Sequence, residues 1–233
     1  MISVQQLSRV FTTDDVETSA LNQINLQVSK GDFIAIMGPS GCGKSTLLNI
    51  LGLLDKPSTG DYFFQDKRLR FAQQGQVERI RRQHFGYIFQ SFNLIDSLTV
   101  AENVELPLIY QGVAASERAK RVKQVLAKTS MDHRASHFPK QLSGGQQQRV
   151  AVARALVIEP AVIFADEPTG NLDTRNGHDV MNLLAELNEQ GSTIVMVTHS
   201  ESHATYGSRV IELLDGEILK ETRQQPMMEL ARA

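Results

Sequence analysis

The sequence has little of several features that mark whole classes of protein. Its 233 residues include one cysteine and no tryptophan, and 24 Lys+Arg nearly balance 26 Asp+Glu. A single cysteine excludes a disulfide framework within the chain and favours the cytosol. The near-zero net charge argues against a polybasic surface, so we expect neither a nucleic-acid partner nor direct insertion into lipid.

Long apolar runs and targeting signals are also missing. The most apolar stretch, residues 150–165, is interrupted by Arg154, Glu159 and Pro160, whereas a membrane span needs about 20 consecutive apolar residues. The N-terminal residues MISVQQLSRVF show neither a basic region nor a long apolar core, so nothing in them predicts secretion. We therefore expect a globular chain without a membrane span of its own.

The pattern of apolar residues changes along the chain. Short apolar segments predict strands at residues 2–7, 21–28, 33–37 and 62–65. From residue 99 the segments are longer, and a helical stripe at 116–128 is formed by Ala119, Val122, Val125 and Leu126. The first part is therefore expected to be rich in strands, and the segment after residue 99 to be a helical insert.

The second half of the sequence predicts a parallel sheet. Two strongly apolar segments, 161–165 and 193–197, flank a helical stretch at 177–189, a pattern typical of strands buried on both faces. Asp215-Gly216 predicts a type I′ hairpin turn. Residues 223–233 are interpreted as a terminal helix or a frayed end.

A phosphate-binding P-loop is predicted at residues 38–45, GPSGCGKS, with the apolar strand FIAIM before it and the helical segment TLLNILGLL after it. Glycines let backbone N–H groups converge on phosphate oxygens at a helix N-terminus. Lys44 would supply a charge to the β- and γ-phosphates, and Ser45 a hydroxyl ligand for Mg²⁺. The predicted nucleotide-binding residues of this segment are Gly38, Pro39, Ser40, Gly41, Cys42, Gly43, Lys44, Ser45 and Thr46.

An acidic pair follows the apolar segment VIFA. Asp166 and Glu167 stand where a buried parallel strand ends, and such strand ends gather active groups. We expect Asp166 to hold hydrated Mg²⁺ and Glu167 to act as the general base that polarises the attacking water. Without the P-loop, the same pair would be interpreted as solvated turn acids.

A second glycine-rich segment, Leu142-Ser143-Gly144-Gly145-Gln146, precedes a helix predicted from about residue 147 to 157. Small residues that open a helix can bind an anion, with the Ser143 hydroxyl as a further ligand. The same residues also suit a plain N-cap and turn. Since the P-loop occupies its own junction, two copies arranged head to tail would bring both segments to one nucleotide.

These motifs together resemble the ABC ATPase family over essentially the whole chain. The match consists of GPSGCGKST, Gln90 after an apolar strand, LSGGQ, VIFADE, Asn171-Leu172-Asp173 and Thr198-His199, in that order. The resemblance implies an α/β fold, a P-loop NTPase (RecA-like) core with an antiparallel β subdomain and an α-helical subdomain. It also implies a nucleotide sandwich in which Ser143, Gly144, Gly145 and Gln146 of one subunit face ATP held by the other.

The resemblance assigns roles to further residues. Phe11 takes the place of an aromatic that stacks on adenine, and Gln90 would touch Mg²⁺ and the attacking water. His199 would hydrogen-bond the γ-phosphate, and Asp173 would cross the dimer interface. Relatives usually carry Asp after the histidine, whereas this chain has Ser200. The predicted catalytic residues are thus Glu167, His199, Gln90 and Lys44, and the predicted metal ligands are Ser45, Gln90 and Asp166.

One ABC ATPase domain is expected to occupy residues 1–233. Within it we expect the nucleotide-binding core and β subdomain at 1–90 and 160–220, the helical subdomain with LSGGQ at 91–159, and a tail at 221–233. The cofactors that the resemblance implies are ATP and Mg²⁺.

The nearest resemblance within the family is to the ATPases of lipoprotein release and macrolide export. It implies a homodimer that hydrolyses ATP to drive a separate integral membrane permease, and a cytoplasmic location on the inner face of the cell membrane through that permease. The apolar side chains between residues 89 and 110 are interpreted as mostly core, with part of the stretch contacting the permease. The transported substrate is not specified by these motifs.

Two other functions fit the same motifs. A soluble ABC ATPase of DNA repair or translation would have no membrane partner, but such proteins usually carry two motif sets, coiled-coil inserts or zinc cysteines, which this sequence lacks. An ATP-dependent regulator of a membrane cell-wall or division complex would have a nearly identical sequence. The membrane partner distinguishes it from a transporter.

Overall fold

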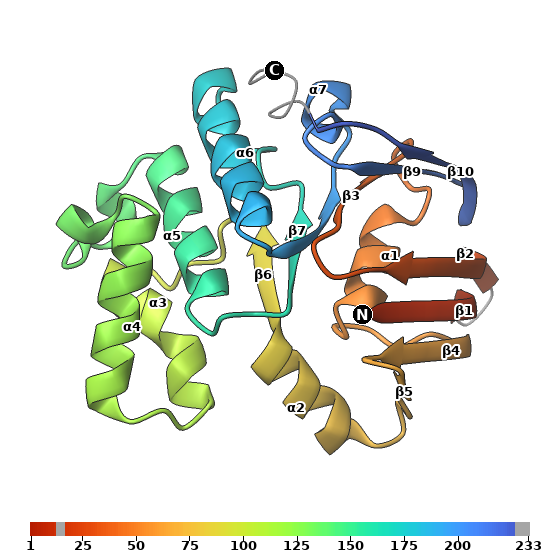
Figure 1. Ribbon diagram of the computed structural model, residues 1–233, viewed down its shortest axis with the longest axis horizontal. Coiled ribbons are helices and arrows are strands. Elements are labelled where there is room, and N and C mark those ends of the chain that lie inside the picture. The colour runs from red at the N-terminus through yellow and green to blue at the C-terminus, as the bar shows by residue number, and fades with distance from the viewer. Residues whose placement is uncertain (13–16, 227–233) are drawn as a thin grey trace. The chain divides into compact units, whose positions relative to one another are not determined.

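The computed structural model describes residues 1–12 and 17–226 (Figure 1). These residues fall into two compact units: the first consists of the described residues within 1–81 and 193–226, and the second is Arg82–Ser192. Each unit contains strands and helices, and the predicted α/β class is confirmed. Most of the C-terminal tail predicted as helical or frayed lies outside the described residues.

The first unit holds an antiparallel sheet of order β2-β1-β4-β5. Its strands are β1 (Ile2–Thr12), β2 (Glu17–Val28), β4 (Thr59–Phe64) and β5 (Lys67–Arg68). The register between β1 and β2 shifts three times between Val4 and Val10, and bulges of this kind interrupt the alternation of side chains. The sequence consequently predicted β1 and β2 shorter than they are.

Parallel pairing in the first unit places β3 (Phe33–Met37) between β8 (Thr193–Val197) and β9 (Arg209–Leu214). The apolar sequences of β3 and β8 are almost completely buried, as the sequence predicts for such strands. Strand β9 returns through Asp215 and Gly216 into β10 (Glu217–Arg223). Both turn residues have positive φ, 46° and 78°, as a type I′ turn requires.

Helices α1 (Lys44–Leu51) and α7 (Glu201–Ala204) belong to the first unit, and α2 (Gln74–His84) begins in the first unit and ends in the second. Helix α2 was not predicted. None of its residues is buried, and its sequence QGQVERIRRQH offers only Val77 and Ile80 as apolar side chains. An apolar stripe is the main helix signal in a sequence, and this helix has almost none.

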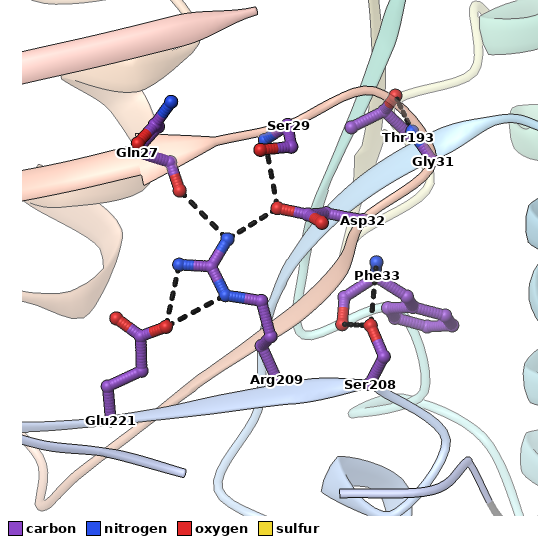
Figure 2. Close-up of polar contacts among 9 residues, drawn as sticks. All are labelled: Gln27, Ser29, Gly31, Asp32, Phe33, Thr193, Ser208, Arg209 and Glu221. Carbon is purple, nitrogen blue, oxygen red and sulfur yellow. Dashed lines mark hydrogen bonds and ion pairs between the residues drawn. The ribbon is translucent and has the colours of Figure 1, made fainter. Parts of the chain in front are cut away.

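The buried side chain of Arg209 connects several strands of the first unit through hydrogen bonds and ion pairs (Figure 2). Arg209, at the start of β9, is 8% exposed. Its guanidinium donates to the carbonyl of Gln27 on β2 at 2.8 Å, and it pairs with Glu221 on β10 at 2.8 Å. It also pairs with Asp32, whose carboxylate accepts the Ser29 N–H at 2.8 Å. One side chain thus links β2, the turn before β3, β9 and β10.

The second unit pairs β6 (Phe85–Phe89) with β7 (Val162–Asp166) in parallel. Its helices are α3 (Val100–Tyr110), α4 (Ala115–Lys128), α5 (Gly144–Leu156) and α6 (Thr174–Glu189), and α3, α4 and α5 contact one another (Figure 1). Short 3₁₀ turns lie at Asp132–Arg134 and Pro139–Gln141. The helical segment expected after residue 99 is therefore present.

The apolar residues of α3, α4 and α5 form one core, in which burial of each Val or Leu side chain contributes about 1.5–3 kcal/mol. Its buried members are Val100, Val104, Leu108, Val122, Val125, Leu126, Met131, Leu142, Val150, Ala153 and Val157. Three of the four side chains predicted for the α4 stripe belong to it. Helices α5 and α6 begin three residues earlier than predicted, because Ser143 and Asp173 cap them.

Candidate functional site

The P-loop joins β3 to α1. Lys44 is 9% exposed, and its Nζ donates to the carbonyls of Gly38 and Pro39, both at 2.8 Å. The ammonium charge is therefore held inside the loop. Helix α1 begins after Gly43 without a side-chain cap, so the positive end of the helix dipole is left for an anion.

Glycine is required at two positions of this loop by close approach of other backbone atoms. A Cβ atom at Gly38 would lie 2.1 Å from the carbonyl oxygen of Leu213, and one at Gly43 would lie 2.4 Å from that of Ala20. Leu213 belongs to the β9–β10 hairpin. Farther along that hairpin, the Gly216 N–H donates to the carbonyl of Cys42 at 3.1 Å. The β9–β10 hairpin therefore packs against the P-loop and limits the conformations that the loop can adopt.

His199 lies two residues after the end of β8, the strand that pairs in parallel with β3. Because β3 and β8 are parallel, the P-loop and His199 leave the sheet at the same edge, where active groups of such sheets lie. The Thr198 N–H donates to the carbonyl of Ile36 at 3.1 Å, which extends the pairing to the residue before His199. Ser200 accepts the His203 N–H at 3.3 Å as the N-cap of α7, a role that aspartate also fills well.

Phe11, the predicted adenine-stacking residue, lies near the end of β1 and is 41% exposed. The guanidinium carbon of Arg9 lies 4.4 Å from its ring centroid. Arg9 in turn makes two hydrogen bonds to Asp55, at 3.0 and 3.2 Å. The Arg9–Asp55 pair therefore supports one face of the ring by a cation–π contact.

Gln90 follows β6 and is bound to Asn171. Gln90 Nε2 donates to the Asn171 side-chain oxygen at 3.3 Å, and Asn171 Nδ2 donates to the Gln90 carbonyl at 3.0 Å. A Cβ atom at Gly170 would lie 2.7 Å from Gln90 Nε2. The absence of a side chain at Gly170 thus leaves room for Gln90.

The acidic pair lies where β7 ends. Asp166 is the register partner of Phe89, the residue before Gln90, so the predicted metal ligands Asp166 and Gln90 lie at the same edge of the parallel pair. Glu167 is half-buried with φ 47°. A non-glycine residue in this left-handed region is uncommon and clusters at functional sites.

The glycine-rich segment LSGGQ begins α5 with a capping box. Ser143 Oγ accepts the Gln146 N–H at 3.3 Å, and Gln146 Oε1 accepts the Ser143 N–H at 3.0 Å. A Cβ atom at Gly145 would lie 2.3 Å from the side-chain oxygen of Asn176 on α6. Both interpretations of this segment therefore stay compatible with its geometry, since a capped helix N-terminus still carries the positive end of the dipole.

Asp173 caps α6 through Asn176. Its carboxylate accepts the main-chain N–H of Asn176 at 3.0 Å and the side-chain amide at 2.6 Å. The main-chain hydrogen bond, followed by the side-chain one, lowers the pKa of the Asp173 carboxyl. Through Asn176, Asp173 is connected to Gly145.

The structure distributes the predicted site residues over the two units. The first unit contains Phe11, Gly38, Pro39, Ser40, Gly41, Cys42, Gly43, Lys44, Ser45, Thr46 and His199, and the second contains Gln90, Ser143, Gly144, Gly145, Gln146, Asp166, Glu167 and Asp173. Sequence reasoning quoted Asn171 within a motif without giving it a role, and it missed Asn176 and Gln148. Gln148 is fully buried and donates to the Pro168 carbonyl at 2.7 Å, yet neither motif spacing nor charge distinguishes it from its neighbours.

Comparison with known proteins identifies the family of this chain. The family model of ABC transporters matches residues 21–170. The chain belongs to the ABC transporter family. An uncharacterized ABC transporter ATP-binding protein of Methanocaldococcus jannaschii, MJ1508, is 49% identical over 94% of this chain and 98% of its own length. As a family member, the chain is an ATPase whose cofactors are ATP and Mg²⁺.

Relatives named MacB are similar over their ATP-binding part. The macrolide export ATP-binding/permease protein MacB of Wolinella succinogenes is 48% identical over 98% of this ABC ATPase, which spans 35% of the MacB length. MacB of Vibrio parahaemolyticus is 46% identical over 95% of the chain. The predicted relation to the macrolide-export ATPases is confirmed at the level of sequence, although the chain spans only about a third of those relatives.

Solved structures agree with the fold. The dimeric post-hydrolysis state of the ATP-binding cassette MJ0796 bound to ADP and Pi has a TM-score of 0.88 and 43% identity, with 97% of this chain and 99% of that chain covered. The cassette cbiO1 from Clostridium perfringens has a TM-score of 0.84 and 30% identity, with coverage of 99% and 90%. The predicted P-loop NTPase fold is thereby confirmed.

Proposed function

We propose that two copies of this ABC ATPase close around ATP and that the closure drives a separate membrane permease of the lipoprotein-release or macrolide-export type. The observation that carries the proposal is the presence of two glycine-lined helix N-termini, those of α1 and α5. Each is suited to an anion. A symmetric dimer would use both, with the P-loop of one copy and Ser143 of the other on each nucleotide.

The residues of the P-loop fit the phosphates of ATP. The Lys44 ammonium is directed into the loop by two carbonyls, and the absence of a side chain at Gly38 lets the Leu213 carbonyl approach the loop closely. We infer that Gly38–Thr46 hold the β- and γ-phosphates and that the exposed ring of Phe11 stacks on adenine. Ser143, Gly144, Gly145 and Gln146 of the facing copy complete the site, with Asp173 at the interface between copies.

The oxygen donors of Ser45, Gln90 and Asp166 suit Mg²⁺, which prefers oxygen ligands and usually keeps several waters. When bound, Mg²⁺ would neutralise charge on the phosphates. Glu167 then takes a proton from the attacking water, and His199 holds the γ-phosphate by a hydrogen bond. Two hydrogen bonds with Asn171 hold Gln90 in place after β6.

Mixing two inactive variants tests the shared site. Lys44→Ala removes the phosphate charge, and Ser143→Arg blocks the α5 N-terminus, so each pure variant should lose ATP hydrolysis. In an equal mixture, a dimer of unlike chains combines the intact P-loop of one with the intact Ser143 of the other. Random pairing in a symmetric dimer then restores about a quarter of the wild-type rate of phosphate release.

The matched control for this experiment carries both substitutions in one chain. A Lys44→Ala/Ser143→Arg double variant mixed with chains carrying Lys44→Ala should stay inactive, because no pairing supplies an intact P-loop. If the two single variants also fail to complement each other while each still binds its partner chain, the shared-site proposal is wrong.

The proposed membrane partner is supported by exposed apolar side chains in the second unit. Val100, Val104 and Leu108 of α3 are fully buried, whereas Ile109 and Tyr110 at its end are 46% and 69% exposed. Among the described residues, no helix has the length and hydropathy needed to cross a bilayer. MacB relatives are named ATP-binding/permease proteins. We infer that this chain lies on the cytoplasmic face of the membrane through a permease that contacts the end of α3.

Substitutions that introduce charge at the end of α3 test the proposed contact with the permease. Ile109→Asp with Tyr110→Asp should abolish co-purification of the ATPase with its permease, because a buried unpaired carboxylate is costly at an apolar interface. Basal ATP hydrolysis of the isolated chain should be retained. The matched control is Leu219→Asp on β10, an apolar residue 67% exposed in the first unit. Equal recovery of the permease with both variants would contradict the proposed contact.

A further inference from the structure

The segment that follows Gln90 has an unusual backbone. Phe92 and Asn93 have φ values of 59° and 51°. Left-handed conformations cost free energy for residues with a Cβ atom, and outside the two-residue turns of hairpins they occur as single residues rather than in succession. Two in a row persist only when surrounding groups hold them.

Arg154 of α5 holds this pair. Its guanidinium donates to the Phe92 carbonyl at 2.7 Å and to the Asn93 carbonyl. Both hydrogen bonds that the structure gives this side chain therefore end on main-chain oxygens. Burial lowers the pKa of the Arg154 guanidinium, although arginine remains charged in proteins.

Further contacts brace the same segment on either side. Gln148, six residues earlier on α5, donates to the carbonyl of Phe89, the residue before Gln90, at 3.4 Å. Beyond Asn93, the fully buried Asn103 accepts the Ile95 N–H at 2.8 Å and donates to the Ile95 carbonyl at 3.0 Å. The segment between these anchors contains Gln90 and the left-handed pair.

We propose that Arg154 is a positioning residue for Gln90: its two hydrogen bonds hold residues 92 and 93 left-handed and join the Gln90 segment to α5, the helix that begins at Ser143. The inference rests on the proposed function, which gives Gln90 and Ser143 their roles at the nucleotide. Because Arg154 connects α5 to the Gln90 segment, a movement of α5 would also move Gln90. Arg154 itself has no contact with nucleotide in this scheme.

We call the two hydrogen bonds from Arg154 to residues 92 and 93 the clamp. Amide hydrogen exchange of the full chain tests the clamp directly. Arg154→Lys keeps the charge, but a lysine ammonium lacks the planar fork that serves two carbonyls. Release of the left-handed pair should speed exchange in residues 91–95 by about tenfold, with residues 146–152 of α5 unchanged. Unchanged exchange at 91–95, or an equal increase along α5, would overturn the proposal.

A second substitution separates positioning from packing. Glycine adopts positive φ without a Cβ penalty, so Asn93→Gly added to Arg154→Lys should recover several-fold of the kcat for ATP hydrolysis that Arg154→Lys loses, with KM for ATP little changed in both. Asn93→Val should instead deepen the loss, since a β-branched residue disfavours this conformation. Purely additive effects of the substitutions at 93 and 154 would overturn the clamp.

The two proposals fail in different ways. Wild-type chain that does not hydrolyse ATP would overturn the proposed function, and hydrogen exchange would still decide whether Arg154 holds the segment. Active wild-type chain with unaltered exchange in Arg154→Lys would overturn only the clamp.

Discussion

Glu167→Gln lowers the kcat for ATP hydrolysis by a factor of about 10²–10⁴, the usual contribution of a general base, and leaves ATP binding intact. The amide has nearly the same shape as the carboxylate but cannot accept a proton from water. The main-chain geometry that places it, with φ 47° and a 3.0 Å hydrogen bond from the Gly170 N–H to its carbonyl, does not depend on the carboxylate. Phosphate release and equilibrium ATP binding measure the two effects separately.

The same variant should accumulate as an ATP-bound dimer. Hydrolysis removes the phosphate that the P-loop of one copy and Ser143 of the other would share. When ATP is not hydrolysed, this phosphate stays in place and the closed dimer persists. Size-exclusion chromatography with ATP and with ADP distinguishes the two states. The matched control is Glu186→Gln, which changes an exposed glutamate on α6. Rapid multiple-turnover hydrolysis by Glu167→Gln would contradict the general-base role.

Arg209→Met lowers the free energy of unfolding by roughly 3 kcal/mol, at the lower end of the cost of breaking a buried ion pair. Methionine fills much of the same volume, so the loss comes from the charges and the carbonyl left behind (Figure 2). Asp32 keeps the Ser29 N–H as a partner, whereas the Gln27 carbonyl loses the guanidinium donor at 2.8 Å. For a chain of this size, the melting temperature should fall by about 10 °C.

The control for Arg209 is an exposed ion pair in the same unit. Arg68, which pairs with Asp61, has a side chain that is 64% exposed, and exposed pairs contribute about 0–1 kcal/mol. Arg68→Met should therefore melt near the wild-type temperature. Equal melting temperatures for the Arg209 and Arg68 variants would show that burial of Arg209 does not stabilise the unit.

Loss of Arg209 should also weaken ATP binding. Arg209 starts β9, and the same hairpin supplies the Leu213 carbonyl against Gly38 and the Gly216 N–H to Cys42. A loosened hairpin supports the P-loop less well. ATP affinity measured below the melting transition should fall for Arg209→Met and stay unchanged for Arg68→Met.

Elements with a strong apolar pattern were predictable from the sequence. The strands FIAIM and TIVMV are buried along nearly their whole length, and the α4 stripe packs into the helical core. Helix α2 was missed because almost no apolar side chains mark it. The early start of α6 was missed because Asp173 was considered for its role at the dimer interface and not as an N-cap. The early start of α5 was missed because the N-cap interpretation of Ser143 was not used to place the first residue of the helix.

By itself, the sequence determined the chemistry of this protein. Spacing of glycine, lysine and hydroxyl groups in the P-loop, and of carboxylates after an apolar strand, predicts phosphate and Mg²⁺ ligands, because such ligation depends on residue type within short segments. The family, its fold and its cofactors followed from these short segments and were confirmed.

Only the tertiary structure decided which side chains hold those segments in place. Asn171 on Gln90, Asn176 against Gly145, and Arg154 on the left-handed pair are each contacts between residues distant in the sequence. Hydrogen bonds to main-chain carbonyls leave no signature in residue type, because every residue carries the same acceptor. The physical reason is that the chemistry of a short segment depends on its side chains, which the sequence gives directly. The position of that segment depends on main-chain atoms that only folding brings together.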